Sequence, residues 1–242
     1  MHEPRVKLPY YRALDQLPCD LPTLDEISKA HTIEDPQFGK RIAAVGENFI
    51  VKHGVRTREN EGNTLLFVEK YLNIPVPRLY AMYRVERELY LVMERIEGST
   101  LESIWSSLTN EHKSSIVAQL NGIVNKMRAL PPPSPSFFGS VDKGSLGHRF
   151  FLSVNPSPGT NGPFHDENEF NAALALRAGD VNSHQLRLVA DFFARQLPKA
   201  LYGHETVFTH SDWHQGNILV SQGADEQYTV TYVNCPLLEE RA

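Results

Sequence analysis

The chain has 242 residues, and its 29 acidic side chains outnumber the 24 basic ones to give a formal net charge of −5. This acidic balance argues against a nucleic-acid partner. No apolar run approaches the roughly 18 residues that cross a membrane. Two cysteines do not make a disulfide framework, and the N-terminus lacks the continuous apolar segment of a signal peptide. We therefore expect a soluble cytoplasmic protein.

The first part of the chain predicts an N-terminal arm followed mainly by strands. Residues 1–35 mix prolines with charges and predict an arm with short helical pieces. Residues 40–54 hold two apolar runs separated by a Gly-Glu-Asn turn, which is typical of a β-hairpin. Residues 58–72 have apolar positions at helical spacing. The prolines of "NIPVP" end this helix, and "ELYLVMERIEG" predicts a strand that ends in a turn at Gly98.

The second part is mainly helical. Ser99 and Glu102 have the spacing of a capping box, which predicts a helix toward Leu108. Three further helices are expected at residues 116–130, 166–179 and 183–197, and a small hairpin follows from "NILV" to "YTVTYV". The intervening residues 137–164 are rich in Gly, Pro, Ser and Asn and predict a long surface loop.

This order of elements, mostly strands and then mostly helices, indicates a two-lobed α+β fold rather than an alternating parallel sheet. We expect the arm at 1–35, an N-lobe at 36–98 and a partial C-lobe at 99–242.

The stretch "HSDWHQGN", residues 210–217, carries the chemistry. Asp212 and Asn217 have the D-x-x-x-x-N spacing of a kinase catalytic loop, in which the carboxylate accepts the proton of a hydroxyl and the amide oxygen binds Mg²⁺. His210, two residues before Asp212, is expected to pack and orient the loop, and Gly216 lets the backbone turn into the next strand.

A phosphotransferase also needs a lysine that holds the ATP phosphates and a glutamate that orients it. Lys52 ends the apolar run "FIVK", and Glu61 lies nine residues later at the start of the next helix. The strand end "VME", with Glu94, could serve as an adenine-binding hinge. The order of all these parts is far more specific than any one of them.

With these motifs the sequence resembles the aminoglycoside phosphotransferase and choline kinase-like families, which are small-molecule relatives of the protein kinases. The resemblance extends over roughly residues 41–233 and includes "FIVKHG", "YLVMERIEGSTL" and "HSDWHQGNILV". It implies a protein kinase-like fold with an antiparallel N-lobe sheet and a mainly helical C-lobe. It also implies ATP and Mg²⁺ as cofactors and a small-molecule hydroxyl as the acceptor.

Carried over by position, Lys52 and Glu61 bind the nucleotide phosphates, Glu94 lies at the hinge, Asp212 is the catalytic base and Asn217 binds the metal. The sequence departs from the family after the last strand, where an aspartate usually binds Mg²⁺. Here Asn234 and Cys235 stand at about that position. Neither replaces a carboxylate well as a Mg²⁺ ligand. The family's later C-lobe helices are also absent, so we expect a C-terminally incomplete fold with weak or no phosphoryl transfer.

Three alternatives stay open. The chain could be a non-catalytic, kinase-like binding module. His204, His210, Asp212 and His214 could instead form a zinc site, because their side chains are of the types that zinc prefers. Asp166, Glu167 and Glu169 could attract a cationic acceptor or simply cap the following helix. The acceptor substrate and the oligomeric state are left open by the sequence.

Overall fold

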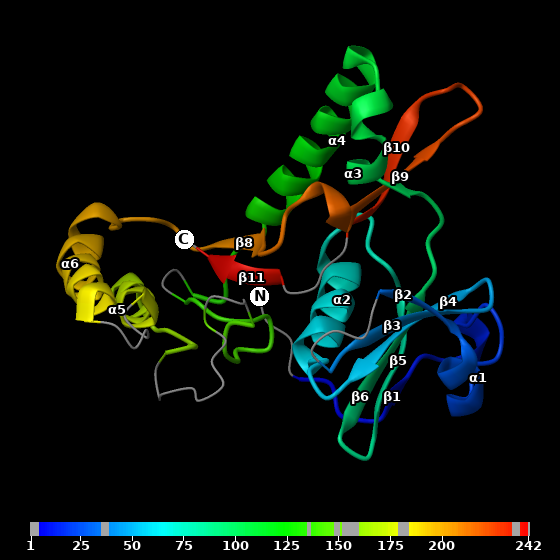
Figure 1. The fold of residues 1–242 in the computed structure, drawn as a ribbon, viewed down its shortest axis with the longest axis horizontal. Helices are drawn as coiled ribbons and strands as arrows, with labels where there is room; N and C mark the ends of the chain where they lie inside the picture. The colour runs from blue at the N-terminus through cyan, green and yellow to red at the C-terminus, as the bar shows by residue number, and fades with distance from the viewer. Residues whose placement is uncertain are drawn as a thin grey trace. The chain divides into compact units, whose positions relative to one another are not determined.

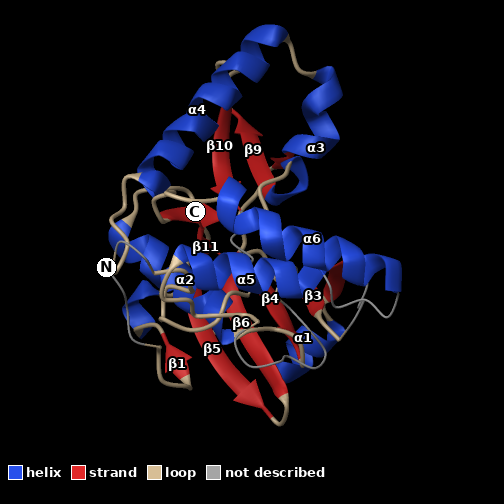
Figure 2. Ribbon diagram, turned by 90° about the vertical axis from the view of Figure 1, so that its left-hand side faces the viewer, coloured by secondary structure: helices blue, strands red, loops and turns tan. Residues whose placement is uncertain are grey.

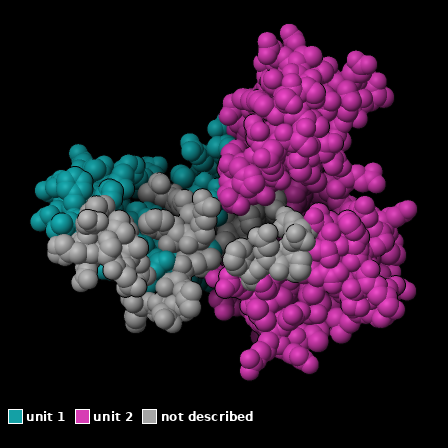
Figure 3. Space-filling view, in the orientation of Figure 1, with its two compact units in different colours: residues 1–4, 124–211, 237–242 teal, residues 5–123, 212–236 magenta. Residues whose placement is uncertain are grey.

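The computed structural model describes residues 5–34, 39–134, 137–147, 151, 160–178, 184–233 and 238–241. The chain forms two compact units, which are coloured separately in Figure 3. The first unit described below, which is unit 2 of Figure 3 (magenta), holds residues 5–123 and 212–236, and the second, which is unit 1 of Figure 3 (teal), holds residues 1–4, 124–211 and 237–242. Residues 212–236 thus lie in the same unit as residues 5–123. The lobe boundaries expected from the sequence stay a prediction.

A six-stranded antiparallel sheet dominates the first unit, with the strand order β1-β5-β6-β4-β3-β2 (Figure 1). Its strands are β1 (Tyr10–Tyr11), β2 (His31–Glu34), β3 (Arg41–Val45), β4 (Phe49–Gly54), β5 (Leu79–Val85) and β6 (Glu88–Glu94). The predicted hairpin is present as β3 and β4, joined at Gly46, whose φ of 59° suits glycine. Both edge strands come from the first 34 residues, for which only helical pieces were expected.

Helix α2 (Glu59–Tyr71) packs against one face of this sheet because Gly62 permits a close approach. A Cβ atom at Gly62 would lie 2.6 Å from the sulfur of Met82 and 3.2 Å from Leu91. The other face is covered by α1 (Leu24–Lys29), whose Ile27 belongs to a buried cluster that also contains Val92. The alternation of Leu91 and Val92 along β6 thus gives the sheet two buried faces.

A second sheet in the same unit has the order β10-β9-β7. It consists of β7 (Ser99–Thr100), β9 (Ile218–Gln222) and β10 (Tyr228–Val233). Helix α3 (Leu101–Ile104), the 3₁₀ turn η2 (Trp105–Ser107) and helix α4 (Asn110–Arg128) follow β7 along the chain. Figure 2 shows α4 beside β9 and β10. The side chain of Gln119 on α4 donates to the carbonyl of Tyr228 and accepts from the N–H of Val230.

The second unit contains α5 (Glu167–Ala178), α6 (His184–Ala200) and a two-stranded sheet of β8 (Val207–His210) and β11 (Leu238–Arg241). The described residues between 137 and 164 form no helix or strand, as predicted, but the predicted surface position is wrong for several of them. Phe138, Leu146, Phe151 and Phe164 are buried in one aromatic cluster with Phe170. A backbone bridge between Phe138 and Phe164 also closes this segment.

The mixed α+β fold predicted from the sequence is confirmed. Among the helices that the structure describes, none combines the length and the apolar character that a membrane span requires.

Candidate active site

Lys52 and Glu61 form a buried ion pair between β4 and α2. The Lys52 ammonium donates to Glu61 Oε1. Only 4% of Lys52 and 5% of Glu61 are exposed. Lys52 lies on the face of β4 that is turned toward α2, while its neighbour Val51 belongs to the cluster on the opposite face. Two charges so deeply buried are tolerated only as a pair.

Asp212 and Asn217 lie together on the loop between β8 and β9. The Nδ2 group of Asn217 donates to the Asp212 carbonyl at 2.9 Å and to its carboxylate oxygen Oδ2 at 3.0 Å. Because the amide nitrogen faces Asp212, the amide oxygen Oδ1 is directed to the other side. The Asp212 side chain is 52% exposed, so a substrate can reach it.

His214 orients this loop, a role that the sequence did not reveal. It precedes the 3₁₀ turn η3 (Gln215–Asn217), and its Nδ1 atom accepts from the N–H of Gly216 at 3.1 Å. An Nδ1 that accepts a hydrogen bond carries no proton, so in the neutral ring the proton is on Nε2. This Nε2 faces Asp212 Oδ2 at 3.7 Å. His210 is buried at the end of β8, which agrees with a structural role.

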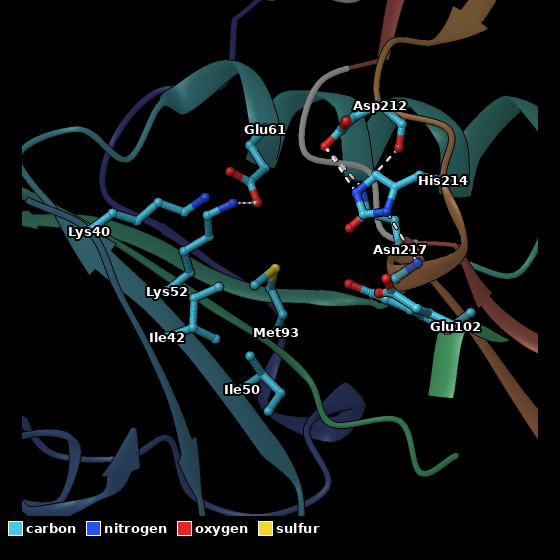
Figure 4. A pocket seen from close by; sticks show the side chains of 12 residues that line it. Lys40, Ile42, Ile50, Lys52, Glu61, Met93, Glu102, Asp212, His214 and Asn217 are labelled. Carbon is cyan, nitrogen blue, oxygen red and sulfur yellow. Dashed lines mark hydrogen bonds and ion pairs between the residues drawn. The ribbon is translucent and has the colours of Figure 1, made fainter. Parts of the chain in front are cut away.

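A cavity of about 430 Å³ brings these groups together (Figure 4). Lys52 and Glu61 lie on one side of it, and Asp212 and Asn217 lie on the other. All of them belong to the same compact unit. Four of the five predicted site residues therefore line one cavity. The remaining lining residues are Lys40, Ile42, Ile50, Met93, Glu102, His214, Gly216 and Tyr232.

The fifth predicted residue, Glu94, lies outside this cavity. Its carboxylate accepts from the N–H of Arg78, and its own N–H donates to the Arg78 carbonyl. Glu94 lines an adjacent, largely apolar cavity of about 310 Å³ that also includes Arg95 and Ile96. The two cavities share Ile42, Ile50, Met93 and Tyr232. The side chain of Glu94 thus ties the end of β6 to Arg78, the residue that directly precedes β5.

Lys40 and Glu102 are cavity residues that sequence reasoning missed as site residues. Lys40 directly precedes β3, and its side chain points into the cavity beside Lys52 (Figure 4). The predicted capping box at Ser99 is wrong, because Thr100 caps α3 by accepting from the N–H of Ser103. Ser99 belongs instead to β7, where it pairs with Val220. Glu102 is therefore not a capping residue, and its carboxylate lines the cavity.

The oxygen atoms on this wall suit a hard divalent cation. The structure offers the amide oxygen of Asn217 and the carboxylates of Asp212 and Glu102. Mg²⁺ is commonly held by one or two carboxylates together with substrate phosphates, so these residues fit it. The positions of Asn234 and Cys235, where the sequence lacks the expected aspartate, lie outside the described residues.

The zinc alternative finds no site in the described part of the chain. No group of three or more His, Cys, Asp or Glu side chains there is arranged to hold a metal ion. His204 instead hydrogen-bonds to Glu167 at 2.6 Å. Burial alone would raise the pKa of the Glu167 carboxyl. The hydrogen bonds from His204 and from the N–H of Gly203 outweigh burial and lower that pKa below its ordinary value.

The acidic residues that open α5 have local partners, which favours capping over attraction of a cationic acceptor. Asp166 accepts from the N–H of Glu169, and Glu169 accepts from the N–H of His165. Glu167 is engaged with Gly203 and His204. The contact from Asp166 satisfies an N–H group in the first turn of α5, which has no intrahelical partner there.

Comparison with known proteins agrees with the predicted family and fold. Residues 47–229 match the model of the phosphotransferase enzyme family, and because this match spans most of the chain, the protein belongs to that family. Among solved structures, the streptomycin–ATP–APH(2'')-IIa ternary complex is similar at a TM-score of 0.57 and 13% identity. That similarity covers 89% of this chain and 69% of the solved one, and it shows a kinase-like fold.

Curated relatives add little about activity. Two subtelomeric hrmA-associated cluster proteins, from two strains of Aspergillus fumigatus, are each 32% identical over 75 residues. The match covers 29% of this chain and only 15% of each relative.

Proposed function

We propose that this protein binds ATP with Mg²⁺ and transfers the γ-phosphoryl group to a hydroxyl of a small molecule. The observation that carries this proposal is the single cavity that Lys52, Glu61, Asp212 and Asn217 line together. Family membership and the kinase-like fold support it. The solved neighbour is a complex with streptomycin and ATP, which makes a hydroxyl-bearing small molecule a reasonable acceptor.

The two adjoining cavities suit the two chemical halves of ATP. The apolar cavity beside Arg95 and Ile96 is lined by Ile42, Ile50 and Met93, and it offers flat apolar contacts to an adenine ring. The polar cavity presents the ammonium groups of Lys40 and Lys52, which attract phosphate oxygens. Glu61 fixes the Lys52 ammonium through the buried ion pair, so the cation is already oriented before ATP binds.

Asp212 is positioned to accept the acceptor's proton. The acceptor oxygen attacks the γ-phosphorus, a new P–O bond forms, and the bond between that phosphorus and the β–γ bridging oxygen breaks. The hydroxyl proton passes to the Asp212 carboxylate, and ADP leaves with the electron pair of the broken bond. His214 and Asn217 hold this carboxylate in place through the contacts described above. A bound Mg²⁺ would neutralise phosphate charge, and Asn217 is its first expected ligand.

Transfer by this chain is expected to be slow. The sequence has no Asp or Glu between Tyr228 and Leu238, where the family usually supplies a metal-binding carboxylate. We therefore expect a turnover below the roughly 1–100 s⁻¹ that is typical of kinases. The same observation favours a second candidate function, a non-catalytic kinase-like module that binds nucleotide without transferring phosphate.

A pair of measurements separates the two candidates. Calorimetric titration with ATP, with and without Mg²⁺, measures nucleotide binding. Incorporation of label from γ-labelled ATP into streptomycin or small alcohols measures phosphoryl transfer. We expect Lys52→Met to abolish ATP binding. Asp212→Asn should leave binding intact and lower transfer at least about a hundredfold, the lower end of what a general base contributes. Asp225→Asn, in the β9–β10 turn, is the matched control and should change neither quantity.

The outcomes are distinct. Binding together with transfer that depends on Asp212 supports the phosphotransferase. Binding without any transfer supports the non-catalytic module. No ATP binding by the unmodified chain, with or without Mg²⁺, contradicts both proposals.

A further inference from the structure

Glu102 has no structural partner that explains its position. It is exposed, and among the described residues it makes no hydrogen bond or ion pair. The N-terminus of its own helix is capped by Thr100, so Glu102 is not needed there. Figure 4 shows its carboxylate in the cavity beside Asn217.

The pairing of β7 with β9 brings the helix that carries Glu102 beside the turn that carries Asn217. Strand β7 pairs antiparallel with β9, so that Ser99 faces Val220 and Thr100 faces Leu219. Helix α3 begins directly after β7 and η3 ends directly before β9, so this strand pairing brings α3, which carries Glu102, into contact with η3, which ends at Asn217. Tertiary pairing, and not a local helix rule, therefore sets the position of this carboxylate.

Gly216 makes room for the Glu102 carboxylate. A Cβ atom at Gly216 would lie 2.9 Å from Glu102 Oε2 and 3.0 Å from the ring of His214. Any other residue would therefore have to displace one of these side chains. The glycine lets a carboxylate approach the backbone directly before the predicted metal ligand Asn217.

The charges of the cavity are divided between its walls. Lys40 and the ion pair of Lys52 with Glu61 lie on one side, whereas Glu102 and Asp212 lie on the other together with the amide of Asn217 (Figure 4). The two carboxylates repel each other, and a divalent cation held by Glu102 and Asn217 would offset this repulsion. A triphosphate on the lysine side would complete the ligands of such a cation.

We propose that Glu102 supplies the protein carboxylate that holds the Mg²⁺ of bound ATP. This inference rests on the proposed function, because it requires ATP in this cavity. It gives the chain a carboxylate ligand from α3, before the catalytic loop, in place of an aspartate after β10. Asn217 and Glu102 are then the protein ligands, and Asp212 remains available to the acceptor hydroxyl.

The test compares the Mg²⁺ dependence of ATP binding in the unmodified chain and in Glu102→Gln. The glutamine keeps the shape of the side chain but removes its charge, and because Glu102 is exposed the variant should fold normally. ATP affinity is measured by calorimetry in EDTA and in excess Mg²⁺. We expect Glu102→Gln to reduce the Mg²⁺-dependent gain at least about tenfold, since loss of even an outer-shell partner costs this much. The affinity in EDTA should not change.

Two further measurements make the result specific. Mn²⁺ in place of Mg²⁺ allows the bound cation to be counted by electron paramagnetic resonance, and its affinity for the ATP complex should fall by the same factor. Glu47→Gln, in the exposed β3–β4 turn, makes the same change of net charge away from the cavity. It should leave both quantities as they are in the unmodified chain.

Three results would overturn the inference. A full Mg²⁺-dependent gain in Glu102→Gln would show that Glu102 is no ligand. An equal loss of affinity in EDTA and in Mg²⁺ would show that the carboxylate contacts the nucleotide itself. In both cases the unmodified chain still binds ATP, so the proposed function stands. An unmodified chain that binds no ATP in either condition overturns the proposed function and this inference with it.

Discussion

The buried pair of Lys52 and Glu61 should make each charge depend on the other for stability. Lys52→Met leaves Glu61 as an uncompensated buried carboxylate, and Glu61→Gln leaves the ammonium of Lys52 in the same position. We expect each single substitution to lower the free energy of unfolding by about 3–5 kcal/mol. The double variant should cost clearly less than the sum, because no buried charge is left. Urea unfolding followed by circular dichroism measures all three, and strictly additive costs would contradict the prediction.

At the scale of single residues, the sequence predicted the parts of the site that are ordered along the chain. Lys52, Glu61, Asp212 and Asn217 could be recognised because each has a characteristic neighbour or spacing, and the structure brings them to one cavity. Glu102 could not be recognised, because its spacing from Ser99 resembles a capping box. Only the pairing of Ser99 with Val220 moves the cap to Thr100. Lys40 had no local pattern at all, since a lysine before a strand is common.

At the scale of elements, Gln119 connects α4 to the edge of β10. Its amide nitrogen donates to the Tyr228 carbonyl at 2.8 Å, and its oxygen accepts from the N–H of Val230 at 2.9 Å. Gln119→Ala leaves both backbone groups without this partner, and Val230 is buried. We expect the free energy of unfolding to fall by about 1–3 kcal/mol. Asn121→Ala, an exposed change on the same helix, is the control. Equal thermal stability of the two variants would refute the role of Gln119.

The face of the six-stranded sheet on the side of α1 carries a stack of aromatic rings across four strands. Tyr83 stacks on Tyr11 with 5.9 Å between ring centroids and on Tyr90 with 5.3 Å, and Tyr90 stacks on His53 with 4.7 Å. Burial, together with the neighbouring phenols Tyr11 and Tyr90, raises the pKa of Tyr83 to about 12. The folded state thus favours the protonated phenol.

The raised pKa of Tyr83 predicts a loss of stability in alkali. A group whose pKa is higher in the folded state contributes fully below its unfolded pKa, which is about 10 for tyrosine, and loses this contribution as the pH rises toward 12. We expect the urea midpoint to fall between pH 10 and 11.5, and to fall less steeply in Tyr83→Phe. Both proteins should show the same midpoint dependence between pH 7 and 9. A Tyr83→Phe curve parallel to that of the unmodified chain above pH 10 would contradict the assignment.

Elements were predicted well where periodicity is strong and poorly where composition alone was the guide. The hairpin of β3 and β4 and the helix α2 lie within one or two residues of their expected bounds. The surface position predicted for residues 137–164 was wrong because it rested on the content of Gly, Pro and Ser, which favours irregular backbone. The burial of this segment is set instead by Phe138, Phe151 and Phe164, which pack in one cluster. The strands β1 and β2 were missed because edge strands this short have too few residues to show an alternation.

At the scale of the whole molecule, the confinement of the candidate site to one of the two units has a measurable consequence. The residues that line the proposed ATP cavity all belong to the unit of residues 5–123 and 212–236. The helices α5 and α6 belong to the other unit. A bound ligand lowers the equilibrium constant for opening of the unit that binds it. The factor is one plus the ratio of the free ligand concentration to the dissociation constant. Units that open separately should therefore respond differently to ATP.

Hydrogen exchange followed by mass spectrometry tests this difference. With Mg²⁺–ATP at about 100 times its dissociation constant, amides in β4 and α2 that exchange through opening of their unit should slow by up to about a hundredfold. Amides in α5 and α6 should keep their rates, because nucleotide binding does not change the opening equilibrium of a unit that makes no contact with it. Addition of adenosine alone should give a smaller effect confined to the first unit, since it lacks the phosphates that Lys52 holds. Equal slowing in α5 and α2 would mean that the chain opens as one cooperative body despite its two compact units.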